Sequence, residues 1–369
     1  MRFKLKKTPL VALAACLALA GNLKSQNQNI NFTVDDPVPV VDQNGQRLML
    51  DGMQGNSVSF QFAGSNAGAS IPITEDSQIK LTYPYPDNFS DIQFNVLNGN
   101  FDQALRQIRN PPINLLHFLA VPEPNCNFHL YSEIYYRALV YAGAPQVAVE
   151  ATRAIPWGNQ NLPPVFLDHA GTLLNRMVNE QKIKPTEDIL SVLQDGLSVG
   201  EFSALALPVA DKLRLLGENE IVESIYNALS QSSDEAMRKL GLMWTAYNLA
   251  NTGQTEEAKR LLKEIGEITQ ESPLFAVYCL AQGRLALTEE NSVQALRFLS
   301  RAMVRTTIAD SYKPEIYFLM IQSYMMDEDE VPASRLAKEM AVFYPNNMWR
   351  KSIINRFPDL EKEGDQLTP

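Results

Sequence analysis

The sequence has few of the residues on which most disulfide frameworks and metal sites depend. Its 369 residues include only three cysteines and three histidines. Cys126 and Cys279 lie far apart, whereas a disulfide framework needs denser cysteines in a smaller domain. We expect two free buried thiols, with one long-range bridge as the alternative.

Common catalytic signatures are also missing. The sequence has no phosphate loop, no dinucleotide-binding glycine motif and no nucleophile elbow. His117, Cys126 and His129 could in principle supply three metal ligands, but zinc sites usually have tighter, repeated spacing and a fourth ligand. Packing and surface polarity are the favoured roles of these residues and of His169. We therefore assign no catalytic, cofactor-binding or metal-binding residue, and we expect no cofactor.

The N-terminal apolar run, Leu10–Ala20, is too short to span a bilayer as a helix. Four basic residues precede it and the polar stretch Asn22–Asn29 comes after it, which is the layout of a secretory signal. Residues 1–25 are therefore a predicted signal peptide, cleaved before Gly21 or after Ser25. The protein would be exported, to the periplasm or to the cell envelope.

A second interpretation concerns Cys16. The sequence Leu13-Ala14-Ala15-Cys16 resembles a lipobox, in which the cysteine is lipidated and the protein is tethered to a membrane. Because the apolar run continues to Ala20, we favour simple cleavage. Membrane association is expected only if Cys16 is lipidated.

The charge of the chain is acidic. The formal net charge is −10, and loss of residues 1–20 removes four basic and no acidic residues, which gives −14. An acidic surface argues against binding to nucleic acid or, by charge, to anionic lipid.

The first part of the mature chain is predicted to contain a small β unit. Residues 26–37 are rich in Asn and Gln, which is typical of a flexible tether. Residues 38–86 show period-two alternation and a tight-turn signal at Asn44-Gly45. We expect about four short antiparallel strands, which are too few for a core of their own and should pack on the helical region after them. The strands are expected near Arg47–Leu50, Ser57–Phe62, Ser70–Ile73 and Gln78–Tyr83.

From residue 87 to 345 the pattern is helical and repetitive. One pattern recurs six times: a turn residue is followed, five positions later, by a small or medium apolar residue. The turns begin at positions 99, 143, 217, 253, 290 and 328. The 74-residue interval is twice 37, which predicts a further turn near residue 180, within Asn179–Lys182. There Pro185 replaces the small residue. The spacing fits two helices of about 14 residues plus two turns, so seven helical hairpins are predicted.

Hairpins of this kind cannot bury their apolar faces alone and must stack on their neighbours. The predicted fold is mainly α: a right-handed α-solenoid of about seven hairpins, preceded by the small antiparallel β unit. An insertion bounded by prolines, at residues 110–124, separates the first two hairpins. Residues 346–369 are expected to form a capping helix, Met348–Phe357, and a polar tail.

The repeats resemble the tetratricopeptide family, whose units have a glycine and, five residues later, an alanine. The match is best over residues 237–345 and weak over the other hairpins. It rests on Leu242, Ala246, Leu249, Ala258, Leu262, Gly283, Ala302, Tyr317, Tyr324, Ala333 and the closing Pro345-Asn346-Asn347. The resemblance implies a protein or peptide partner in the concave face, and the groove would be sought in the C-terminal repeats.

Two further groups of residues could bind ligands. The acidic run Asp327–Glu330 could hold a hard cation, but it lacks the EF-hand pattern, so a solvated turn is favoured. Tyrosines gather at Tyr83 and Tyr85 and on the helical stretch Tyr131–Tyr141. Packing between helices is favoured over stacking on a peptide or glycan.

The function expected from the sequence is therefore that of a non-enzymatic extracytoplasmic scaffold that holds protein partners. One alternative is a membrane-tethered glycan-binding lipoprotein of a polysaccharide uptake system. Others are an enzyme with a site at the β–α junction and a purely structural envelope protein.

Overall fold

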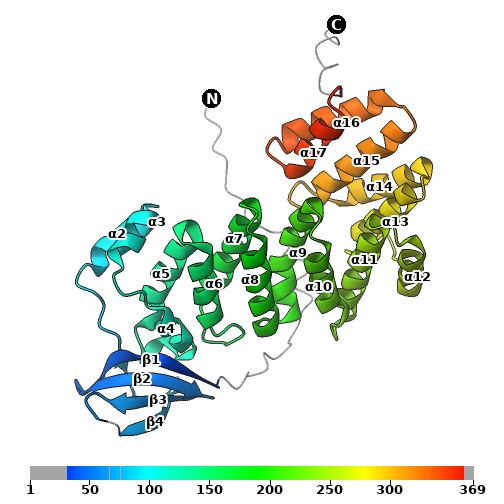
Figure 1. Ribbon diagram of the computed structural model, residues 1–369. Coiled ribbons are helices and arrows are strands. Elements are labelled where there is room, and N and C mark those ends of the chain that lie inside the picture. Colours follow the sequence, from blue (N-terminus) through cyan, green and yellow to red (C-terminus); the bar gives the residue numbers. More distant parts are fainter. Residues whose placement is uncertain (1–30, 66, 75, 361–369) are drawn as a thin grey trace, which may run out of the picture. The chain divides into compact units, whose positions relative to one another are not determined.

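The structure is a computed structural model that describes residues 31–65, 67–74 and 76–360. The expected signal peptide, Cys16 and residues 26–30 of the expected tether lie outside these ranges. The described chain is mainly helical and has one five-stranded antiparallel sheet near its N-terminus (Figure 1). It forms two compact units, one ending at Ser198 and the other beginning at Val199.

The sheet has the strand order β4-β3-β2-β1-β5. Its strands are β1 (Asn31–Asp42), β2 (Arg47–Gln54), β3 (Ser57–Phe62), β4 (Gly68–Pro72) and β5 (Leu81–Thr82). The prediction of a small antiparallel unit is confirmed, but it has five strands because β1 begins at Asn31. Residues 31–37 are therefore not a tether: Asn31 pairs with Gln54 in β2, and Val34 is buried in the sheet core.

The sheet shares its core with the segment that separates the first two hairpins. This segment forms α4 (Ile113–Leu116) and two 3-10 turns, η1 (His117–Ala120) and η2 (Glu123–Asn125). Its side chains Leu115, Phe118 and Val121 join Val40 and Leu50 of the sheet in one buried cluster. The expectation that the β unit packs on the residues after it is confirmed.

The described residues contain seven helical hairpins, as the spacing predicts. The N-terminal unit contains α2 (Phe89–Leu97) with α3 (Phe101–Gln107), α5 (Phe128–Ala142) with α6 (Pro145–Ala154), and α7 (Val165–Asn179) with α8 (Ile183–Gly196). The C-terminal unit contains α9 (Val199–Leu216) with α10 (Asn219–Ser230), α11 (Glu235–Asn251) with α12 (Thr255–Ile265), α13 (Phe275–Thr288) with α14 (Ser292–Arg305), and α15 (Lys313–Met326) with α16 (Glu330–Phe343).

Six of the seven hairpins turn in the same way. In each of these six, the turn that follows the first helix contains a residue with a positive φ, between 55° and 84°. The residue after it donates its backbone N–H to the carbonyl five residues earlier, at 2.8–3.0 Å. This is the Schellman motif, which satisfies the carbonyls at the end of the helix. The residues with positive φ are Gly99, Gln181, Gly217, Gly253, Glu290 and Glu328. The turn at Gly143 is the exception, with a φ of −70°.

The residue five positions after each turn residue is fully buried, because the first helix of the hairpin packs across it. These residues are Ala104, Ala148, Thr186, Val222, Ala258, Ala295 and Ala333. The assignment of Pro185 to this position is wrong by one residue, because the turn residue with positive φ is Gln181. Thr186 satisfies its buried hydroxyl by donating to the carbonyl of Lys182 at 2.8 Å.

The expected capping helix is α17 (Met348–Arg356), which packs on α15 and α16. Its Trp349 ring lies 5.1 Å from the ring of Phe318, and Ile353 is buried. This helix therefore covers the last hairpin with an apolar face.

Candidate functional site

The residues considered as metal ligands do not form one site. His117 lines a pocket described below, and the His129 Nε2 lies 3.1 Å from the carbonyl oxygen of Leu119 in the core. Cys126 is a free, partly buried thiol whose Sγ lies 3.8 Å from the carbonyl oxygen of Val121. Among the described residues, no group of three or more His, Cys, Asp or Glu side chains could hold a metal ion.

The remaining polar candidates have structural partners. His169 lies 3.0 Å from the Glu133 carboxylate. Within the acidic run, Glu328 has the positive φ of the α15–α16 turn, and Asp327 accepts a 2.6 Å hydrogen bond from the hydroxyl of Ser292. The run is therefore a hairpin turn that is tied to the preceding hairpin. Cys279 is a free buried thiol, so both cysteines are free, as expected.

The tyrosines of α5 mostly pack in the core. Tyr131, Tyr135 and Tyr136 are buried, whereas Tyr141 is exposed and stacks on Phe101 at 4.5 Å between ring centroids. Tyr83 and Tyr85 are half-buried at the junction of sheet and helices and pack against Tyr131. Packing is confirmed for the buried three, and the ring of Tyr141 remains accessible.

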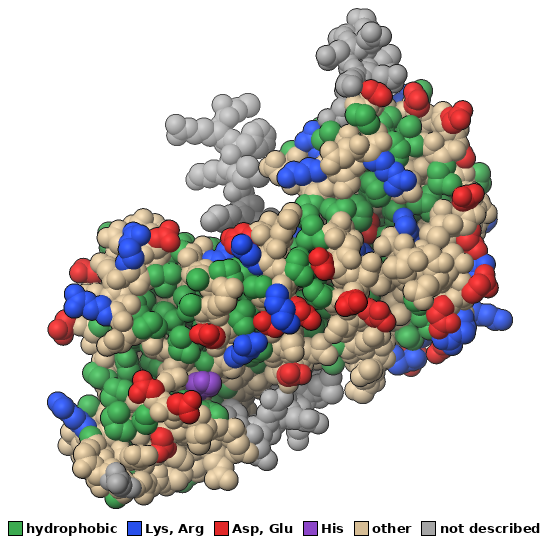
Figure 2. Space-filling view, in the orientation of Figure 1, with side chains coloured by type: hydrophobic (Ala, Val, Ile, Leu, Met, Phe, Trp, Pro, Cys, Tyr) green, Lys and Arg blue, Asp and Glu red, His purple; other side chains and the backbone are tan. Residues whose placement is uncertain are grey.

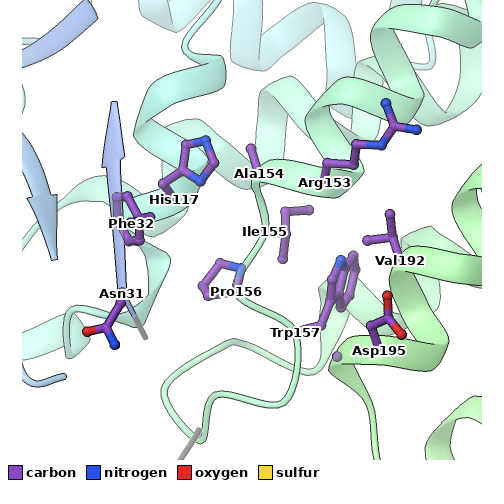
Figure 3. A pocket seen from close by; sticks show the side chains of 11 residues that line it. Asn31, Phe32, His117, Arg153, Ala154, Ile155, Pro156, Trp157, Val192 and Asp195 are labelled. Atoms are coloured by element: carbon purple, nitrogen blue, oxygen red, sulfur yellow. The ribbon is translucent and has the colours of Figure 1, made fainter. Parts of the chain in front are cut away.

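The N-terminal unit contains an open pocket of about 430 Å³. It is formed by the first residues of β1, the start of η1, the loop after α6 and the end of α8 (Figure 3). The residues that line it are Asn31, Phe32, His117, Arg153–Trp157, Val192, Asp195 and Gly196. Its volume is within the range of small-ligand sites.

Aromatic rings form much of the wall. The rings of Phe32 and His117 lie side by side, 5.0 Å apart (Figure 3). Burial lowers the pKa of the His117 imidazole, so at neutral pH this ring is an uncharged part of the wall. The indole N–H of Trp157 donates to the carbonyl of Thr152 at 2.8 Å, which fixes the ring at the end of α6.

Two glycines let the loop that carries Trp157 lie against the end of α8. Gly158 has a φ of +78°, and a Cβ there would lie 2.2 Å from the carbonyl oxygen of Gly196. A Cβ on Gly196 would lie 2.5 Å from the Cβ of Trp157. Substitution of either glycine would push the loop away and disturb this wall of the pocket.

Charged side chains lie at the rim. The guanidinium of Arg153 points away from Pro156 in Figure 3 and lies 3.7 Å from the Asp188 carboxylate, while Asp195 lies beside Trp157. The pocket therefore combines an apolar, aromatic wall with charges of both signs at its edge. This combination suits non-covalent binding of a neutral or mixed-charge segment.

The C-terminal unit has a buried ionic cluster centred on Arg214 of α9. Its guanidinium bonds to Asp211 at 2.7 Å and also to Glu315 of α15 and the hydroxyl of Tyr226. It lies 4.5 Å from the ring centroid of Trp244.

Two hydroxyl groups donate hydrogen bonds to the carboxylates of the cluster. Tyr247 of α11 donates its hydroxyl to Glu315 at 2.5 Å, and Ser311 donates to Asp211. Burial alone would lower the pKa of the Arg214 guanidinium, but Glu315 and Asp211 raise it well above its usual value, so this group stays charged.

The cluster joins helices that are distant in sequence. Arg214 and Glu315 are 101 residues apart, on the first and fourth hairpins of the C-terminal unit. In an extended array each hairpin would contact only its neighbours. The cluster instead links α9, α11 and α15 through side chains that are buried inside this unit.

No protein-family model, no curated protein and no solved structure matches this chain. Within residues 31–360, apart from residues 66 and 75, no helix is both long enough and apolar enough to span a membrane.

Sequence reasoning missed both the pocket and the ionic cluster. The pocket draws on segments around residues 31, 117, 155 and 195, which no local pattern connects. For the cluster a signal was present: Asp211 and Arg214 interrupt the apolar residues of one helix, and Glu315 directly precedes the apolar stretch Ile316–Ile321. Charged residues at such positions are buried only when they are paired.

Proposed function

We propose that the protein is an exported, non-enzymatic scaffold that binds a protein partner through a tetratricopeptide-like solenoid of helical hairpins. The observation that carries the proposal is the repeated hairpin, with one turn geometry in six of seven copies and one fully buried position in all seven. Such arrays commonly offer extended surfaces to peptides and proteins. The N-terminal basic and apolar segment supports export.

The pocket of the N-terminal unit is the favoured docking point for that partner. In the C-terminal unit, where the resemblance to the family is strongest, Arg214 and its partners are buried and bonded to one another between α9, α11 and α15. The pocket instead opens to solvent beside an exposed arginine, Arg153, and has aromatic walls. These features suit an extended peptide segment with an apolar side chain.

Site-specific photo-crosslinking in intact cells tests this function. A photoreactive residue at Arg153, on the rim of the pocket, should give a reproducible protein adduct from the cell envelope. The same residue at Arg260, an exposed position of α12, is the matched control. If Arg153 yields no adduct beyond that of the control, the pocket does not bind a protein partner.

The second candidate function is glycan binding by a membrane-tethered lipoprotein. The aromatic wall formed by Phe32, His117 and Trp157 supports it, because sugar rings stack on such surfaces. This candidate also requires lipidation of Cys16. Incorporation of a labelled fatty acid into the wild-type chain, but not into a Cys16→Ser variant, would favour it, and no incorporation would remove it.

A further inference from the structure

The last two hairpins carry the same unusual solvent-facing pattern on their second helices. In α14 it consists of Val293, Arg297 and Val304, and a shift of 38 residues maps these onto Val331, Arg335 and Val342 of α16. All four valines are strongly exposed: Val293 by 72%, Val304 by 82%, Val331 by 62% and Val342 by 75%. Two valines in one helix are separated by three turns, or about 16 Å.

The pattern is absent from the equivalent positions of the two preceding hairpins. In α12 and just after it these positions are Glu256, Arg260 and Glu267, and Arg260 forms an ion pair with Glu257. In α10 and just after it they are Glu220, Ser224 and Gln231. Polar residues at these positions are ordinary for a solvent-facing helix. The exposed valines of α14 and α16 therefore call for an explanation other than the needs of the fold.

More apolar side chains are exposed at the C-terminal ends of α14 and α16. Ile308, just after α14, and Phe343, at the end of α16, are 58% and 46% exposed. Figure 2 shows hydrophobic side chains at the surface over the C-terminal helices, with basic side chains beside them.

The charge of α14 is opposite to that of the chain. Residues 291–309 contain three arginines, Arg297, Arg301 and Arg305, and no acidic residue, although the whole chain has a net charge of −10. In the described part of the chain, these three arginines form no salt bridge, and neither does Arg335 of α16. Unpaired arginines beside exposed valines are suited to a partner with acidic and apolar side chains.

We propose that α14 and α16 form a second docking surface, for an acidic amphipathic segment of another protein. The apolar side chains of that segment would cover the valines, and its carboxylates would pair with Arg297, Arg301 and Arg335. The acidic turn Asp327–Glu330 lies next to Val331 and would repel carboxylates there, so the carboxylates of the segment are expected beside the arginines. An anionic membrane is the alternative that the test below distinguishes. This surface is separate from the pocket of the N-terminal unit, so the proposal does not depend on that pocket.

Binding of defined probes to the whole chain tests the proposal. The first probe is a fluorescent amphipathic peptide of about 18 residues, long enough to span the stripe, with Leu on one face and Glu beside it. The second has Lys in place of every Glu. We expect the Glu peptide to bind at least about tenfold more tightly than the Lys peptide, and this preference should fall as salt rises.

Variants locate the binding. A double Arg297→Glu and Arg335→Glu variant should lose about tenfold in affinity for the Glu peptide, and so should a double Val304→Ser and Val342→Ser variant. Arg260→Glu in α12 is the matched control and should bind as the wild type does. All the substituted side chains are exposed, and an unchanged melting temperature will show that the fold is kept.

Two results would overturn the proposal. One is equal affinity of the wild-type chain for the Glu and Lys peptides, or equal affinity of the wild type and both double variants for the Glu peptide. The other is binding to a membrane instead of the peptide. The wild type would then cosediment with vesicles of phosphatidylcholine and phosphatidylglycerol, the arginine variant would not, and the Glu peptide would not bind, so the surface would be a membrane contact.

Discussion

At the scale of the residue, Arg214 shows how a charge can be kept in the core of a helical array. Its guanidinium lies over two aromatic rings, Trp244 and Tyr247, and has a carboxylate partner on each of two helices. A buried ion pair is weak evidence for net stabilisation, but loss of one member leaves the others uncompensated. The cluster therefore favours one arrangement of α9 against α15, because the planar guanidinium of Arg214 bonds to both carboxylates at once.

Replacement of Arg214 by Met should lower the free energy of unfolding by about 3–5 kcal/mol, because Glu315 and Asp211 would stay buried without a cation. Arg260→Met, which removes an exposed ion pair, should cost less than about 1 kcal/mol. Urea unfolding of both variants measures the difference. Equal midpoints for the two would show that the cluster does not hold the unit together.

The cysteines allow a prediction of reactivity. Burial raises the pKa of the Cys126 thiol to about 12 and that of Cys279 to about 11. A thiol is protonated below its pKa, so at pH 8 almost no reactive thiolate is present at either residue. A Cys16→Ser chain should therefore react slowly with a thiol reagent when folded and give two rapid equivalents in guanidinium. Rapid native labelling would contradict the burial of these side chains.

At the scale of the element, the hairpin turn explains why the repeats could be found from sequence. The turn needs a residue with positive φ, and glycine adopts that conformation without steric cost. Gly99, Gly217 and Gly253 mark it directly. Gln181, Glu290 and Glu328 adopt the same conformation without being glycine. The turns at Glu290 and Glu328 were found from the small residue five positions later, and only the turn near residue 180 was located by spacing alone.

These turns predict substitutions of opposite sign. Glu290→Gly should stabilise the chain by about 0.5 kcal/mol, because the cost of a left-handed non-glycine residue exceeds the added entropy of the unfolded glycine. Gly253→Ala, at the equivalent position, should destabilise it by about 1 kcal/mol. Thermal unfolding of the pair decides the matter, and shifts of the same sign would disprove a shared turn geometry.

At the scale of the whole molecule, the sequence revealed what is local and missed what is distant. The hairpins, the small sheet and the last helix depend on patterns within about 40 residues, and all are present. The start of β1 was misread as a tether because its polar residues hide Phe32 and Val34, whose packing partners come much later in the chain. The ionic cluster and the pocket depend on contacts that span up to 101 residues, which no single-sequence period encodes.

The shared core predicts which fragments can fold. Residues 31–86 contain the whole sheet but lack Leu115, Phe118 and Phe128 of its core, so this fragment should be unfolded. Residues 31–198, which form one compact unit, should fold alone. Amide dispersion in NMR spectra distinguishes the two outcomes. A dispersed spectrum from residues 31–86 would show that the sheet needs no help from the helices.

The same shared core sets an order of events for a chain that is synthesised from its N-terminus. The strands β1 to β4 emerge first, but the side chains that complete their core come from α4, η1 and α5. Until those segments appear, the sheet has unpaired edges and an uncovered apolar face, the features that invite aggregation. The protein is thus most vulnerable early in its biogenesis, and its need for a chaperone should end when α5 has left the ribosome.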